Sequence, residues 1–288
     1  MTAAQAAAAL AAALILGRPV AAATTDTVQY LSSPASYGAV RNGLNLEYGT
    51  NAFPPLTETA LEAYQVQGSG PVTLTFRMHA DTGSFRFNFG YYKYLPALNS
   101  IDTSTTAGKQ AYATTALAAG NAVLVFNDVI HDPGATTTTK TVNGGDLLGF
   151  FLIPDDTLAN FQTSPGSFAV TGVGSATFGI GGPKRWPFFG YAAANPGGRD
   201  QLMSFAGTSK ATGKRSNMFA WEDISRASLP GDFYCDNAFN DLIFAVEGVE
   251  ASVTSPAAIP EIDPAGLAGV MALVASALGL RERRRFTL

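Results

Sequence analysis

The stretch 221–247, WEDISRASLPGDFYCDNAFNDLIFAVE, joins an acidic loop to an apolar strand, and the rest of the sequence is interpreted outward from it. Its last six residues, LIFAVE, place alternate side chains on opposite sides, which predicts a β-strand. Turn-forming residues at 228–232 precede this strand. We therefore expect a loop that leads into a half-buried strand, with Asp241 where the strand begins.

The loop is rich in oxygen donors and contains no lysine. A carboxylate beside an apolar strand must be hydrogen-bonded, ion-paired or metal-bound to offset its loss of water. Calcium suits such a loop because it takes about 6 to 8 oxygen ligands in flexible geometry, although the spacing is not that of an EF-hand. An acidic turn held by backbone amides and an arginine is the alternative. The expected ligands of a structural calcium ion are Glu222, Asp223, Asp236, Asn237, Asn240 and Asp241.

The same residues carry a resemblance to a known family. WEDI, a spacer and DNAFNDLIF resemble the end of a family of secreted bacterial domains of unknown function, whose signature is E-D, a spacer, D-x-D-[YF]-N-D and a hydrophobic strand. Ala238 stands where the family has its middle aspartate, which removes one potential ligand. GGDLLGFFLIP at 144–154 and DQLMSF at 200–205 are also similar, so the resemblance covers about residues 65–250. It implies a binding or structural module, because the family has no established catalytic activity. The matching positions are Glu222, Asp223, Asp236, Phe239, Asn240 and Asp241.

Strand patterns recur upstream of the loop and predict an all-β fold. Residues 71–79 and 85–89 alternate between apolar and polar around the turn ADTGS, which predicts a β-hairpin with a solvated His79 on its polar face. Short strands with Gly-rich and Thr-rich connections are typical of an antiparallel, jelly-roll-like β-sandwich. The other predicted segments are strands at 122–129, 146–153, 167–170, 176–180 and 218–221, a polar hairpin or edge segment at 134–145, and short helices near 57–64 and from Asp155 and Asp156.

One loop, 183–200, gathers aromatic residues among prolines and glycines. Two interpretations are open: the rings stack on a glycan, or they cover one end of the sandwich. The aromatic residues are Trp186, Phe188, Phe189 and Tyr191.

Composition excludes several classes of function. Only 14% of the 288 residues are charged and the net charge is -4, so the sequence lacks the basic footprint of a nucleic-acid-binding protein. The single cysteine, Cys235, excludes an internal disulfide framework. The two histidines are His79 and His131, and the sequence has no G-x-S-x-G motif and no phosphate-binding glycine loop. We therefore expect a protein that is not an enzyme.

Both ends of the sequence indicate export. Residues 1–23 are an alanine-rich apolar run that ends in a small-x-small pattern, which predicts a signal peptide cleaved by signal peptidase. The chain ends with IPEIDPAG, an apolar span at 265–280 and an arginine cluster, which resembles a PEP-CTERM sorting signal. That resemblance implies recognition by an exosortase-type membrane protease and delivery to the cell envelope or the extracellular matrix; a plain single-pass anchor is the alternative. The sorting motif is Ile259, Pro260 and Glu261, and the stop-transfer residues are Arg281, Arg283, Arg284 and Arg285.

The expected organisation is a signal peptide at 1–23, a sandwich domain at 24–250, a linker at 251–258 and a sorting signal at 259–288 with a transmembrane helix at 265–280. Together these features predict a protein of the cell surface or extracellular matrix with a structural or adhesive role. The alternative is a carbohydrate-binding module or carbohydrate-active enzyme on the same scaffold, which adds extracellular polysaccharide as a partner.

Overall fold

The computed structural model describes the central part of the chain, namely residues 37–50, 63–81, 86–129, 136–168, 170, 186–222 and 239–251. All of them belong to one compact unit, Pro19–Val253. The predicted signal peptide, sorting motif and transmembrane helix lie outside the described residues. None of the helices within these ranges combines the length and apolar character needed to cross a membrane.

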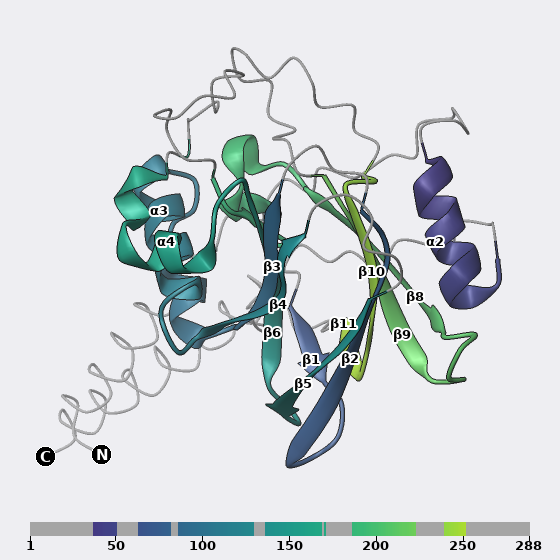
Figure 1. Cartoon of the computed structure of the whole chain (residues 1–288). Coiled ribbons are helices and arrows are strands. Elements are labelled where there is room, and N and C mark those ends of the chain that lie inside the picture. Colours follow the sequence, from purple (N-terminus) through teal and green to yellow (C-terminus); the bar gives the residue numbers. More distant parts are fainter. Residues whose placement is uncertain are drawn as a thin grey trace, which may run out of the picture. The chain divides into compact units, whose positions relative to one another are not determined.

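Two antiparallel β-sheets form this unit (Figure 1). Sheet A has the strand order β5 (Thr137–Asn143), β2 (Pro71–Asp81), β10 (Leu242–Glu247), β9 (Arg215–Trp221) and β8 (Leu202–Thr208). Sheet B has the order β11 (Val249–Ala251), β1 (Tyr64–Val66), β6 (Leu147–Pro154), β3 (Phe87–Lys93) and β4 (Ala122–Val129), and β7 (Phe188–Phe189) also pairs with β6.

The inner faces of the two sheets pack together through aromatic side chains. Phe89 of β3 and Phe244 of β10 have ring centroids 4.2 Å apart. Phe150 of β6 and Phe219 of β9 lie 4.9 Å apart. Tilted ring pairs of this kind stabilise a core beyond the area that they bury. The prediction of a mostly β fold with two packed antiparallel sheets is confirmed, and its jelly-roll-like connectivity stays a prediction.

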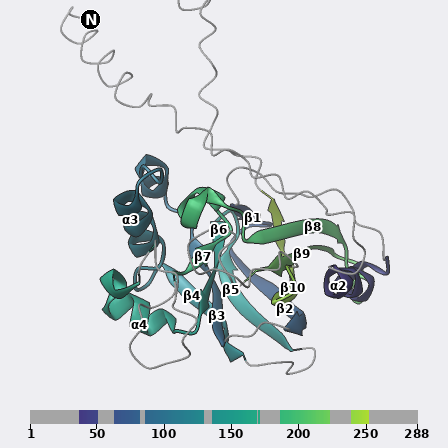
Figure 2. The same cartoon turned by 90° about the horizontal axis from the view of Figure 1, so that it is seen from above.

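Helix α2 (Gly38–Tyr48) covers the outer face of sheet A (Figures 1 and 2). Val40 and Leu44, one turn apart, pack into a second apolar cluster with residues of β8, β9 and β10. Gly43 permits this close approach, because a Cβ there would lie 2.7 Å from the Ile243 side chain. Strand β10 is therefore buried on both faces, so the prediction that it is half-buried is wrong.

Two helices, α3 (Thr106–Ala116) and α4 (Leu158–Thr163), lie on the side of the sheets away from α2 (Figures 1 and 2). The hydroxyl groups of Tyr112 on α3 and Tyr92 on β3 are 2.7 Å apart, which ties α3 to the outer face of sheet B. The cap of α4 is Thr157 rather than the predicted Asp155 or Asp156, since its Oγ1 accepts from the Asn160 N–H group at 3.1 Å. The 3-10 helices are η1 (Pro96–Ser100), η2 (Pro165–Ser167), η3 (Ala192–Ala194) and η4 (Pro196–Gly198).

The predicted hairpin at 71–89 is wrong in its pairing. Both strands form, but β2 pairs with β5 and β10 in sheet A, whereas β3 pairs with β4 and β6 in sheet B. The predictions of strands at β4, β6, β9 and β10 and of an edge segment at 134–145 are confirmed. Helix η2 occupies 165–167 at the start of the strand predicted at 167–170. The strand predicted at 176–180 and most of the helix predicted near 57–64 lie outside the described residues.

Candidate functional site

The two ends of the acidic loop lie side by side at one end of sheet A. β9 ends at Trp221 and β10 begins at Leu242, and these two residues are partners in the antiparallel ladder. The Asp241 N–H group donates to the Trp221 carbonyl oxygen at 3.1 Å. Glu222 and Asp241, at opposite ends of the loop, are therefore neighbours at its base. Asn240 lies next to them, whereas Asp223, Asp236 and Asn237 are outside the described residues.

The loop base includes a buried carboxylate. Glu222 is 1% exposed, and its backbone N–H group donates to the Gln201 carbonyl oxygen at 3.0 Å. Strand alternation places Glu222 two residues after Ala220 and Asp241 two residues before Ile243, on the face that α2 covers. Carboxylates on one face of adjacent strands repel each other unless a cation or a proton compensates them.

At this end of the sheet the sequence analysis missed Asp81 and named Phe239 only as a position of the family signature. Asp81, the last residue of β2, is 4% exposed and pairs with Leu242. In the sequence Asp81 looks like the start of a turn, so no pattern predicted that its side chain is buried. Phe239 is 1% exposed and has a left-handed backbone with a φ of 49°. Its place in the family signature was the only sign of its importance, and such a backbone is unusual for a bulky residue.

No metal cluster is complete among the described residues. In the part of the chain that the structure describes, no three His, Cys, Asp or Glu side chains are grouped so that they could hold a metal ion. Calcium takes about 6 to 8 oxygen ligands, more than Glu222, Asn240 and Asp241 supply. A calcium ion at this loop would therefore need ligands from 223–238, and the calcium site stays a prediction.

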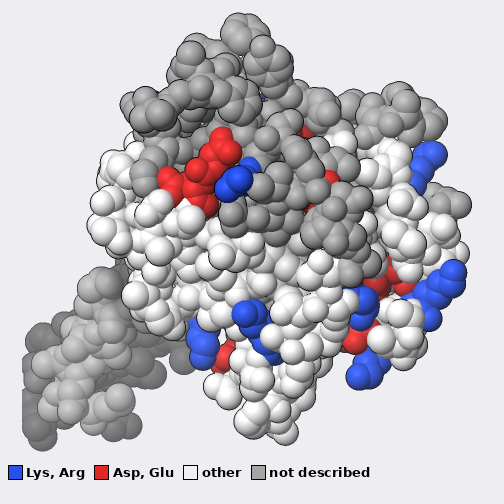
Figure 3. Space-filling model, in the orientation of Figure 1, with Lys and Arg blue, Asp and Glu red and all other residues white. Residues whose placement is uncertain are grey.

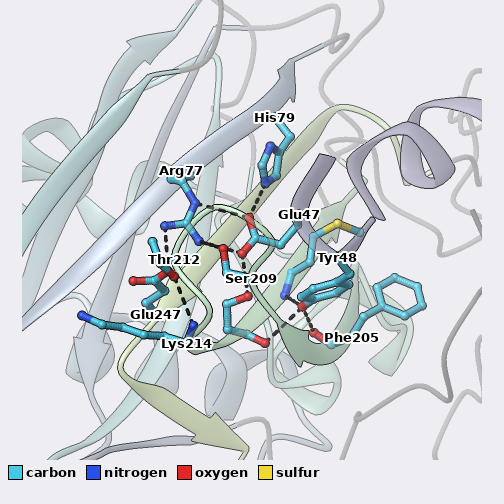
Figure 4. A network of polar contacts seen from close by, with 11 residues as sticks. Glu47, Tyr48, Arg77, His79, Phe205, Ser209, Thr212, Lys214 and Glu247 are labelled. Atoms are coloured by element: carbon cyan, nitrogen blue, oxygen red, sulfur yellow. Dashed lines mark hydrogen bonds and ion pairs between the residues drawn. The ribbon is translucent and has the colours of Figure 1, made fainter. Parts of the chain in front are cut away.

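A second polar cluster lies between α2 and sheet A (Figure 4). At its centre is Glu47 of α2, which is 1% exposed. Arg77 Nη2 donates to Glu47 Oε1 at 2.6 Å, and Ser216 Oγ donates to the same oxygen at 2.6 Å. His79 Nε2 lies 2.9 Å from Glu47 Oε2, and Arg77 Nη1 lies 2.9 Å from Glu247 Oε1. The cluster thus joins α2 to three strands of sheet A.

The electrostatics of this cluster follow from its hydrogen bonds. Burial alone would raise the pKa of Glu47, but hydrogen bonds from His79, Arg77 and Ser216 outweigh it and lower the pKa from 4.5 to about 2. Glu47 is therefore ionised at neutral pH. The prediction of a solvated His79 is wrong, because its side chain is 9% exposed and in contact with Glu47. Through these contacts with Arg77 and His79, the cluster ties α2 to sheet A.

Next to this cluster, Tyr48 attaches the last turn of α2 to the backbone of sheet A. Its hydroxyl oxygen accepts from the Met218 N–H group at 2.8 Å and lies 2.8 Å from the Phe205 carbonyl oxygen. Phe205 and Met218 are themselves partners in the β8–β9 ladder. A Cβ at Gly207 would lie 2.8 Å from the Tyr48 ring, so the glycine makes room for it.

The aromatic residues of the loop at 183–200 are buried. Trp186, Phe188 and Tyr191 are 2%, 4% and 5% exposed, and Phe189 pairs with β6 through β7. The Trp186 indole N–H group donates to the Ala194 carbonyl oxygen at 3.2 Å. These rings therefore belong to the core, and of the two interpretations the covering of the sandwich is the one that fits.

The described surface carries few charged groups in the view of Figure 3. Basic and acidic side chains lie there in small groups, and no continuous basic patch crosses the part of this face that the structure describes (Figure 3). The residues of the predicted sorting signal, 259–288, lie outside the described residues.

Residues 142–249 match the model of a family described as a domain of unknown function (DUF4114). The match runs from the end of β5 to the first residue of β11 and includes the acidic loop. Helix α2 and strands β1 to β4 precede it. A search found no match for the chain among curated proteins or solved structures. The similarity to a domain of unknown function agrees with the resemblance drawn from the sequence and assigns no activity.

Proposed function

We propose that this chain is an exported protein of the cell surface or extracellular matrix, with a structural or adhesive rather than catalytic role, whose acidic loop binds calcium. The observation that supports the calcium site best is the pairing of Trp221 with Leu242, which sets Glu222 beside Asp241 at the loop base. Ligands from both ends of the loop can then converge on one ion. The carbohydrate-binding alternative gains no support from the loop at 183–200, whose aromatic side chains are buried.

Export rests on the sequence of the two ends. The proposed route uses signal peptidase after residue 23 and an exosortase-type membrane protease that recognises Ile259, Pro260 and Glu261. The intact mass of the protein recovered from the envelope of its native host should show both ends removed. Recovery of the full-length chain from the cytosol would contradict the proposal, and a mass that lacks only the signal peptide would indicate a plain membrane anchor.

Calcium binding predicts a change in thermal stability. If the folded protein binds calcium and the unfolded chain does not, calcium at about 100 times its Kd stabilises the fold by about 2.7 kcal/mol. At roughly 2 to 4 °C per kcal/mol, the Tm should rise by about 5 to 11 °C over a chelated sample. Scanning calorimetry of the metal-free protein, with and without calcium, measures this rise.

Three substitutions test where calcium binds. Asp241→Asn keeps the shape of the side chain but removes its charge, so it should abolish most of the rise in Tm. Asp155→Asn is the matched control: Asp155 has a left-handed backbone with a φ of 54°, which asparagine tolerates, and it lies outside the loop. Ala238→Asp restores the acid of the family signature and should tighten calcium binding. Identical Tm values in calcium and in chelator would mean that hydrogen bonds and ion pairs alone hold the loop.

A further inference from the structure

Strand β5 has an open edge, because it stands at the end of sheet A and pairs, among the described strands, with β2 alone (Figure 1). Its register with β2 continues from Thr137 to Asn143 without a bulge. Alternate residues of β5 are exposed, and the strand contains no proline or glycine. A long, regular and exposed edge of this kind is a template for pairing with another strand.

The other strands at the ends of the two sheets lack such an edge. The pairing of β4 with β3 shifts register twice. β11 consists of three residues, and the first four residues of β8 are buried. Bulges, short strands and cover are the means by which natural proteins block unwanted strand pairing. Within the part of the chain that the structure describes, β5 is therefore the edge best suited to accept a further strand.

Hydrogen bonds at both ends of the β2–β5 ladder show which backbone groups of β5 face outward. The Met78 N–H group donates to the Thr136 carbonyl oxygen at 2.9 Å, and the Gly144 N–H group donates to the Gly70 carbonyl oxygen at 2.7 Å. Hydrogen-bonded and non-hydrogen-bonded pairs alternate along an antiparallel ladder. The even-numbered residues of β5 therefore bond to β2. The outward N–H and C=O groups belong to Thr137, Thr139, Thr141 and Asn143.

These outward groups match those of a second copy of the same strand. In an antiparallel pair with a two-fold axis at Thr139, this residue lies opposite itself, and Thr137 lies opposite Thr141 of the second copy. Every outward N–H and C=O group of the three threonines then gains a partner. Their side chains share one face of β5, so threonine meets threonine across the new pair, which is a favourable cross-strand combination.

The single charged residue of β5, Lys140, fits this register. It lies opposite Leu74 of β2, on the face of the strand away from Thr139. In a pair centred on Thr139, it faces Thr138 of the second copy, so the two lysines are diagonal neighbours. A pair centred on Lys140 would instead place the two ammonium groups directly opposite each other, where like charges are destabilising. The lysine therefore favours the register centred on Thr139.

We propose that β5 is a self-association edge, at which two copies of the chain join by antiparallel pairing of their β5 strands about a two-fold axis at Thr139. The two five-stranded A sheets then continue into one another. A two-fold contact of this kind is closed, so it produces a dimer rather than a fibre. This inference goes beyond the proposed function and depends neither on the calcium site nor on the sorting signal.

Sedimentation of the full-length protein in mild detergent, over a series of concentrations, tests the proposal. The wild type should form a dimer. Thr139→Pro should abolish the dimer and leave the protein folded, because the Thr139 N–H group does not bond to β2 and proline is tolerated where an edge N–H group faces outward. Thr139→Val keeps the N–H group and suits a strand, so it should dimerise like the wild type. Lys140→Gln removes the diagonal repulsion and should strengthen the dimer.

Single cysteines determine the register, in a background that carries Cys235→Ala. Thr139→Cys places the cysteine opposite itself at a Cα separation of about 5.5 Å, which a disulfide can bridge. Oxidation should therefore cross-link this variant as a homodimer. Thr141→Cys should not cross-link with itself, since it lies opposite position 137. A mixture of Thr141→Cys and Thr137→Cys should cross-link.

Three results would overturn the proposal. The first is a wild type that stays monomeric at every concentration, even if an added peptide or polysaccharide slows hydrogen exchange of the β5 amide groups. The second is a dimer that persists in folded Thr139→Pro, and the third is cross-linking of Thr141→Cys with itself but not of Thr139→Cys. If Thr139→Pro does not fold, the cysteine variants decide. Absence of calcium binding would overturn the proposed calcium site and leave the dimer standing.

Discussion

Individual side chains attach α2 to sheet A, and Glu47 lies at the centre of their polar contacts. A carboxylate that is 1% exposed is costly unless several donors reach it. Arg77, His79 and Ser216 supply these donors from two strands. In the sequence Arg77 and His79 are polar positions of an alternating strand and Ser216 is a polar residue far from them, and only the fold shows that they converge on Glu47.

The low pKa of Glu47 predicts how stability depends on pH. Its pKa falls from 4.5 in the unfolded chain to about 2 in the folded protein. At about 1.4 kcal/mol per pKa unit, the charged group contributes about 3 kcal/mol. Because the folded pKa is the lower one, this contribution is complete above pH 4.5 and is lost as the pH falls through about 2.

Glu47→Gln should therefore lower the free energy of unfolding by about 3 kcal/mol near neutral pH and make it less dependent on pH between about 4.5 and 2. Urea unfolding at pH 6 and pH 3 measures both effects. Glu250→Gln is the control, since Glu250 is 40% exposed and lies 3.4 Å from Arg215 in a surface pair that contributes about 1 kcal/mol or less. Equal loss of stability on acidification in wild type and Glu47→Gln would contradict this account.

At the scale of elements, local sequence pattern identified most strands of the two sheets but not their partners. The alternation at 71–79 corresponds to a buried face with Leu74 and Phe76, whereas at 85–89 the polar Asn88 is buried as well as Phe89. Consecutive strands usually pair, so a hairpin was the natural expectation. Pairing is decided by long-range contacts such as Phe76 opposite Val246, which the local pattern does not contain.

Helix α2 shows why a helix can lack a recognisable apolar pattern in the sequence. Its buried positions are Val40, Gly43, Leu44 and Glu47, which have the spacing of a helix face. Two of the four are a glycine and a glutamate, so the apolar pattern is missing. The glycine is there for close packing on Ile243 and the glutamate for the polar cluster. The remaining signal was Gly49, a left-handed helix cap with a φ of 73°.

The candidate site was also predictable only in part, because it depends on contacts between residues far apart in the sequence. Oxygen donors and a family signature identified Glu222, Asn240 and Asp241 from the sequence. The sheet register then explains how residues far apart in the loop become neighbours. The burial of Phe239 depends on a helix almost 200 residues earlier, which no local pattern could indicate.

For the molecule as a whole, the segment that matches the family is smaller than the folded unit. Residues 142–249 contain β6 to β10, but β10 needs β2 as a neighbour and β6 needs β1 and β3. The segment also lacks Phe76, Phe89 and Tyr91 from the core between the sheets. Without α2, the outer face of sheet A would expose apolar side chains to water, namely Met203, Phe205, Met218, Ala220, Ile243 and Ala245.

A fragment of residues 142–249 should therefore not fold on its own, whereas a fragment of residues 37–251 should. Loss of β2 leaves unpaired backbone groups along β10, and loss of β1 and β3 leaves them along β6. Such exposed edges also promote aggregation. Circular dichroism should show no cooperative thermal transition for the short fragment, and a dye that binds exposed apolar surface should report its uncovered sheet. The long fragment should melt cooperatively, since it keeps both sheets and α2. A cooperative transition of the short fragment would show instead that β6 to β10 form a complete folding unit, with α2 and β1 to β4 added around it.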